Sequence, residues 1–125
     1  MEIVLNAIAN RGILADERIG IKVLSPCNTK NYMVFMTSLN EDGFFHISSN
    51  AYWFTPLEVK VGDRIVLYTR NGNSSVKEDT HGFNTYFLFW GLDKPLFTED
   101  YHGVVIAHIN DWELSAELQV PSSSS

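Results

Sequence analysis

Cysteine and positive charge are both scarce in this chain. Cys27 is the only cysteine among 125 residues, so no internal disulfide can form, and we expect a free structural thiol in a reducing compartment. Nine Lys and Arg residues stand against 15 Asp and Glu residues, which gives a net charge of −6. Nonspecific nucleic-acid binding needs cations that replace the counterions of the phosphates. The composition therefore predicts no nucleic-acid partner.

Long hydrophobic runs are absent as well. No apolar run approaches the ~20 residues that a membrane-spanning helix needs, so no membrane partner is expected. The first residues contain no basic segment followed by an apolar core, and Glu2 and Asn6 interrupt them, so no secretory signal is expected. We therefore expect a cytoplasmic or virion-associated protein.

The motifs of common enzymes are missing too. The chain has no Gly-x-Ser-x-Gly elbow, no glycine-rich phosphate loop and no His-x-His or His-Glu-x-x-His pair. We therefore predict no catalytic residue, no cofactor and no metal ligand. The alternative is a small hydrolase or metal-dependent enzyme that uses His81 beside Asp79, or His102 beside Asp100, because a histidine and a carboxylate on one face can orient a base or bind a metal.

Apolar residues are plentiful, at 45% of the chain, and aromatic residues make up 13%. This is enough material for a packed core, which argues against disorder. A chain of this length fits one domain and buries roughly two-thirds of its unfolded surface. We assign residues 1–120 to this domain and residues 121–125 to a low-complexity serine tail.

Apolar alternation is clearest in residues 63–69, where Ile65 and Leu67 share one face. Asn71-Gly72 follows and predicts the positive φ values of a tight reversal between antiparallel strands. Residues 19–23 alternate in the same way, so their odd-numbered residues should face the core.

Short strand-like segments with turn signals between them recur along the chain. We count about eight of them, at spacings near ten residues, and find no amphipathic helix. No segment is evident that could supply the dozen or so residues of a parallel crossover. The pattern therefore predicts an all-β fold, a single-domain antiparallel β-sandwich. The segments are 3–8, 19–23, 32–37, 44–47, 52–54, 63–69, 86–90 and 104–109, with a hairpin turn at Asp42-Gly43 and a last strand or helical turn at 113–120.

Two segments of the second half carry a family resemblance. They are GDRIVLYT at 62–69 and FLFWGLDKPLFTEDYHGVVIAHINDWE at 87–113, which resemble the glycine-turn strand, the aromatic strand and the closing strand of the lamin-tail-domain family. The family often has a Gly-Asp pair before its last strand, where this chain has His102-Gly103. The resemblance implies an immunoglobulin-like β-sandwich that acts as an adhesion or docking module without catalytic residues.

Aromatic residues are the main candidates for a binding surface. Tyr52-Trp53 and Trp90 lie in runs that place large rings on both sides of a strand, so some rings should face outward. Exposed Trp and Tyr favour interfaces, whereas packing into the core is the alternative. Carbohydrate binding by such exposed aromatics is a further possibility.

The polar insert 70–84 is the second candidate, because long loops on a rigid scaffold often carry recognition residues. Its candidates are Arg70, Lys77 and His81, although a tolerated insertion would look the same. We therefore predict a non-enzymatic protein-binding or structural module. It would dock a protein partner or a second copy of itself, as in a larger assembly such as a virion, and an unpaired edge strand is an alternative contact.

Overall fold

The computed structural model describes residues 1–39, 45–99 and 101–112. In this part of the chain nearly all regular structure is β, which confirms the all-β prediction. No helix found there is long and apolar enough to cross a membrane. The elements are β1 (Ile3–Ala9), β2 (Arg18–Val23), β3 (Cys27–Asn28), η1 (Thr29–Asn31), β4 (Tyr32–Leu39), β5 (Phe45–Trp53), β6 (Glu58–Val59), β7 (Arg64–Arg70), β8 (Ser75–Glu78), β9 (Asn84–Leu92) and β10 (His102–His108).

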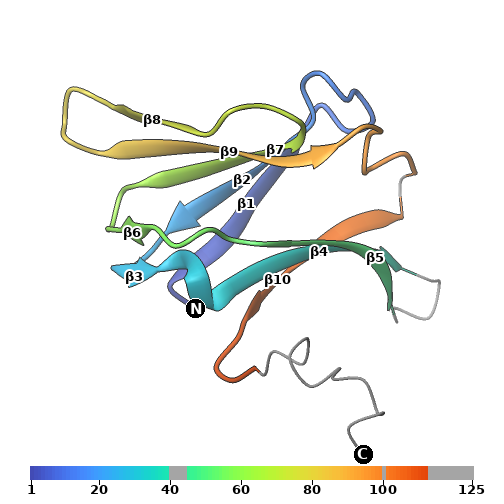
Figure 1. Cartoon of the computed structure of the whole chain (residues 1–125), viewed down its shortest axis with the longest axis horizontal. Helices are drawn as coiled ribbons and strands as arrows, with labels where there is room; N and C mark the ends of the chain where they lie inside the picture. The colour runs from blue at the N-terminus through green and yellow to red at the C-terminus, as the bar shows by residue number, and fades with distance from the viewer. Residues whose placement is uncertain (40–44, 100, 113–125) are drawn as a thin grey trace, which may run out of the picture.

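These strands form three sheets. A five-stranded sheet has the order β1-β2-β7-β9-β8, a three-stranded sheet has the order β10-β4-β5, and β3 pairs with β6. Figure 1 shows the five-stranded sheet above the three-stranded sheet, with β3 and β6 at the left end. The two larger sheets face one another across the core.

The core forms from the inward positions of both sheets. Ile19 and Ile21 of β2 and Ile65 and Leu67 of β7 are fully buried, as their alternation predicts. The three-stranded sheet contributes buried side chains from β4. The whole cluster is Ile3, Ile19, Ile21, Val23, Tyr32, Val34, Phe54, Val59, Ile65, Leu67, Leu88, Leu96 and Phe97.

The pairing of β7 corrects the wholly antiparallel prediction. β7 runs parallel to β9, and β8 pairs antiparallel with the far side of β9. Residues 71–83, which contain β8, therefore form the crossover connection that was not evident from the sequence. All four residues of β8 are exposed, so its sequence shows no apolar alternation that would reveal a strand.

The predicted reversal at Asn71-Gly72 is also wrong in its geometry, because neither residue has a positive φ. The tight turn lies instead between β8 and β9. There Gly82 has a φ of 81° and its N–H donates to the Asp79 carbonyl oxygen over 3.3 Å. Glycine suits this position because other residues rarely adopt a positive φ.

Three other predictions differ from the structure or lie outside it. β5 is one strand across Ser48-Ser49-Asn50, where the polar run predicted a break. The segment 25–31, which lies between the predicted strands 19–23 and 32–37, contains β3 and η1. The Asp42-Gly43 turn, the segment 113–120 and the serine tail 121–125 lie outside the described residues.

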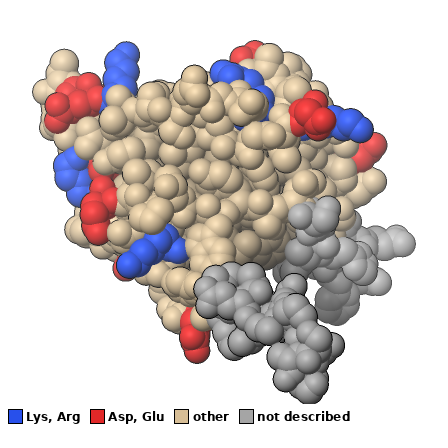
Figure 2. Space-filling model, viewed as in Figure 1, with Lys and Arg blue, Asp and Glu red and all other residues tan. Residues whose placement is uncertain are grey.

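Charged side chains lie mainly around the rim of the molecule in the view of Figure 2, and the middle of that face carries few of them.

Candidate functional site

The outer surface of the three-stranded sheet is apolar where the structure describes its side chains. Tyr32 and Val34 of β4 point into the core, so the alternation of the strand places Met33 and Phe35 on the opposite side. Cross-strand register adds their neighbours on β5 and β10. We call this surface the tryptophan face, which consists of Met33, Phe35, Ala51, Trp53, Val105 and Ala107, together with Trp112 beside Trp53. None of these side chains is charged.

Trp53 is held in an outward position on this face. Its side chain is 43% exposed, and its indole N–H donates to the Lys30 carbonyl oxygen over 2.6 Å. Its ring meets the edge of the Trp112 ring at a centroid distance of 5.1 Å, and Trp112 is 51% exposed. Because the indole donor is already bonded, the accessible area of Trp53 is apolar and in a fixed position.

Tyr52 and Trp90, the other aromatic candidates, point the opposite way. Both are partly buried against the core, with ring centroids 5.9 Å apart, where β5 of one sheet approaches β9 of the other. The Tyr52 ring also meets the edge of Phe54 at 5.3 Å, and burial raises the pKa of its phenol. The structure therefore does not bring these two rings together with Trp53.

The candidates of the polar insert lie on the five-stranded sheet. The Arg70 guanidinium donates to the carbonyl oxygens of Ala15 and Asn71, each over 3.0 Å. It also lies 4.9 Å from the ring centre of Tyr68 and 5.0 Å from that of Phe89. Lys77 is exposed on β8, and His81 is exposed in the β8–β9 turn.

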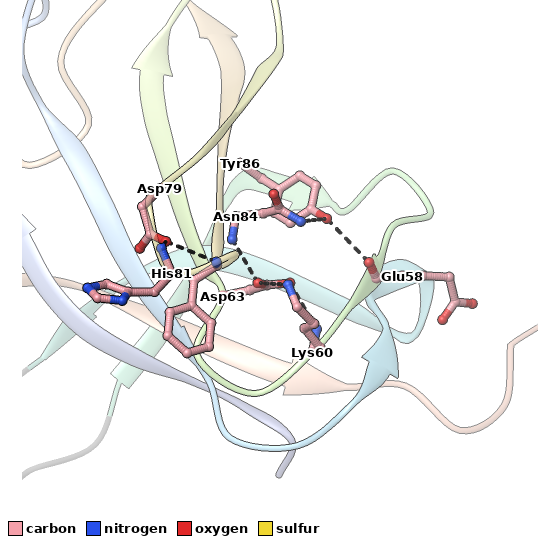
Figure 3. Close-up of polar contacts among 8 residues, drawn as sticks. Glu58, Lys60, Asp63, Asp79, His81, Asn84 and Tyr86 are labelled. Atoms are coloured by element: carbon pink, nitrogen blue, oxygen red, sulfur yellow. Dashed lines mark hydrogen bonds and ion pairs between the residues drawn. The ribbon is translucent and has the colours of Figure 1, made fainter.

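Two aspartates organise the corner that contains His81 (Figure 3). The Asp63 carboxylate accepts hydrogen bonds from the Lys60 ammonium group over 2.8 Å and from the Asn84 N–H over 2.9 Å. Burial alone would raise the pKa of the Asp63 carboxyl, but these bonds together lower it below its usual value. This carboxylate therefore joins the β6–β7 turn to the start of β9.

His81 donates its hydrogen bond to the neighbouring acid through its backbone N–H. The Asp79 carboxylate accepts from the backbone N–H groups of His81 and Phe83, over 2.8 and 3.0 Å. Figure 3 shows the His81 imidazole pointing away from this carboxylate. The Asp79 carboxylate therefore caps the turn that contains it, and it does not orient the His81 imidazole as a catalytic base.

His102, the second enzymatic candidate, lies at the start of β10 in the other sheet. Its Nδ1 accepts from the Glu99 N–H over 3.2 Å, and the Arg11 guanidinium donates to its carbonyl oxygen over 2.7 Å. Asp100, its expected partner, lies outside the described residues. Within 1–39, 45–99 and 101–112, no group of three His, Cys, Asp or Glu side chains could hold a metal ion.

No motif or alternation in the sequence identified Glu17, whose side chain is fully buried in the structure at 0% exposure. Its carboxylate accepts four hydrogen bonds, from the N–H groups of Gly12, Leu96 and Phe97 and from the Thr69 hydroxyl, over 2.6–3.0 Å. Burial raises the pKa of this carboxyl, and the four bonds outweigh burial, so the net pKa is lowered. Glu17 thus acts as a structural clamp, because all its acceptor positions are engaged.

A hollow of about 420 Å³ lies between β1 and β10. Leu5, Ile8 and Val104 line it with apolar atoms, and Arg11 is its one charged lining residue. The Arg11 guanidinium already donates to the carbonyl oxygens of Glu99 and His102. The hollow therefore lacks a set of free polar groups that converge on a substrate.

No protein-family model, curated protein or solved structure was found to match this chain. The resemblance to the lamin-tail-domain family thus stays a prediction from the sequence.

Proposed function

We propose that the protein is a non-enzymatic assembly module that associates with a second copy of itself through the tryptophan face. The observation that supports this is the outward Trp53–Trp112 pair on a surface without charged side chains. Aromatic side chains are enriched in the centres of protein interfaces, whereas charged side chains are depleted there.

The net charge favours this surface for contact between copies. Each copy carries a net charge of −6, so contacts between two acidic surfaces are repulsive. An uncharged apolar face avoids this repulsion, and a two-fold axis lets the same face meet itself. We further propose that the fold is an immunoglobulin-like sandwich of the lamin-tail type, and that the module belongs to a larger assembly such as a virion.

Light scattering across a tenfold range of concentration tests the proposal. We expect the molar mass to rise towards that of a defined oligomer, and Trp53→Glu to return the protein to a monomer because it places a charge in the apolar contact. Ile13→Glu is the matched control, since Ile13 is 55% exposed in the β1–β2 loop and the substitution changes the net charge equally. A wild-type protein that stays monomeric throughout the range would refute self-association.

A further inference from the structure

The outer surface of the five-stranded sheet differs from the tryptophan face in carrying positive charge. Ile65, Leu67 and Leu88 point into the core, so Val66 and Tyr68 of β7 and the alternate residues of β9 point outward. The register extends these positions to β2 and β8. We call this surface the basic face, which consists of Arg18, Lys22, Arg64, Val66, Tyr68, Arg70, Lys77, Phe87 and Phe89.

Five of the nine Lys and Arg residues of the chain lie on the basic face. Among the described residues the one ion pair joins Lys60 to Asp63, which are not part of it. Lys22 and Arg64 are direct cross-strand partners, an arrangement of like charges that destabilises a sheet. The cations of this face therefore have no carboxylate partner in the described part of the chain, and an anionic ligand would relieve their repulsion.

The aromatic rings of the basic face favour carboxylates over nucleic-acid bases as that ligand. Tyr68 and Phe89 stack on one another at 5.2 Å, and the Arg70 guanidinium covers both rings. Gly72 lies so close to Phe89 that a Cβ atom there would come within 2.5 Å of the ring. Base stacking needs open ring faces, which these two residues do not offer.

The charge distribution also favours a short ligand. Without the five cations of the basic face, the rest of the chain has a net charge of −6 − 5 = −11. A long polyanion such as nucleic acid would extend past the basic face and would be repelled by the net negative charge of the rest of the chain. A segment with only a few carboxylates would contact the cations alone.

The cations lie at two ends of the face with apolar side chains between them. Arg18 and Lys22 are four residues apart on β2, which corresponds to about 13 Å in a strand. Val66 and Phe87, which are direct partners, lie between the two ends. In an extended peptide, residues i, i+2 and i+4 point the same way and span the same ~13 Å. We propose that the basic face binds an extended protein segment with the pattern acidic–x–apolar–x–acidic.

Fluorescence anisotropy of a labelled peptide Ser-Glu-Ser-Leu-Ser-Glu-Ser, titrated with the full chain, tests this proposal. We expect binding that weakens as the ionic strength rises from ~0.05 M to ~0.5 M. The double variant K22Q/R64Q should weaken binding about tenfold, since it removes two exposed charge pairs. The double variant K30Q/K94Q removes the same charge from other surfaces and should bind as the wild type does.

Two further measurements separate the alternatives. An oligothymidine that binds more tightly than the peptide, and loses affinity in K22Q/R64Q, would overturn the proposal in favour of nucleic acid. Failure of the peptide to bind, or equal binding by K22Q/R64Q and the wild type, would also overturn it. The site is independent of self-association, so Trp53→Glu should leave peptide affinity unchanged.

Discussion

The two outer sheet surfaces share one core but differ in chemistry. The tryptophan face has no charged side chain, whereas the basic face has five cations around aromatic rings. Both arise from the same alternation, in which every second residue is committed to the core. The inward residues therefore specify the fold, and the outward residues are free to give each sheet a different partner.

Removing the Glu17 carboxylate should have the largest effect on stability, because this carboxylate connects segments that lead to both sheets. The side chain joins the β1–β2 loop to β7 and to the segment that leads to β10. Glu17→Gln places an amide NH₂ group among donors, so we expect the free energy of unfolding to fall by about 3 kcal/mol. Chemical denaturation measures this change. Glu99→Gln, at an exposed glutamate, is the control, and equal stability of the two variants would contradict the clamp.

Gly72→Ala should disturb the basic face alone. A Cβ atom at this position would lie 2.5 Å from the Phe89 ring, so the ring or the loop must move, at a cost of about 1–3 kcal/mol. Gly103→Ala is the matched control on the other sheet, where the nearest side-chain atom is 3.8 Å away. We expect Gly72→Ala to weaken peptide binding and to leave self-association intact. Equal thermal stability of the two variants would count against the close contact.

Acid should destabilise the protein through Glu17 and Asp63. The pKa values of both carboxyls are lowered in the folded state, so their stabilising effect is present above their ordinary pKa values of 4.5 and 3.8. It is lost as the pH falls through the lower folded values. The melting temperature should therefore change little between about pH 5 and pH 7 through these groups and drop below about pH 4. The Glu17→Gln variant should show a shallower drop, and an unchanged drop would exclude Glu17 as its source.

Ionisation of Tyr32 should have a smaller effect on stability, at alkaline pH. Burial and the hydrogen bond that its hydroxyl donates to Glu2 raise the pKa of Tyr32 to about 12. A raised pKa means that the contribution to stability is present below about pH 10 and is lost as the pH rises towards 12. Ultraviolet titration of the phenols should lose one late-ionising group in Tyr32→Phe, with a loss of about 1 kcal/mol in stability. Titration identical to that of the wild type would contradict this assignment.

His81→Ala should have the smallest effect of all. The imidazole is exposed and points away from Asp79, while the backbone N–H of the residue makes the turn contact. We expect unchanged self-association, unchanged peptide binding and no metal in elemental analysis of the wild type. A bound metal that disappears in this variant would instead support the enzymatic alternative.

The sequence predicted the inward residues well and the topology poorly. Alternation identified Ile19 and Ile65 as core because each lies in a strand with one buried side. It could not reveal β8, whose residues are all exposed, or Glu17, which looks like part of an ordinary charged run. Nor could it assign Trp53 to the surface, since the direction of a ring in a continuous aromatic run depends on which neighbours the strand pairs with.

The ends of the five-stranded sheet set a limit on how copies can aggregate. β8, at one edge, is only four residues long and carries Lys77, and β1, at the other, has an irregularity between Leu5 and Ala7. Short, charged or bulged edges oppose the unlimited strand-to-strand growth that produces fibrils. Any polymer that grew strand to strand through this sheet would have to remodel an edge first, so the five-stranded sheet opposes fibril growth at both of its edges.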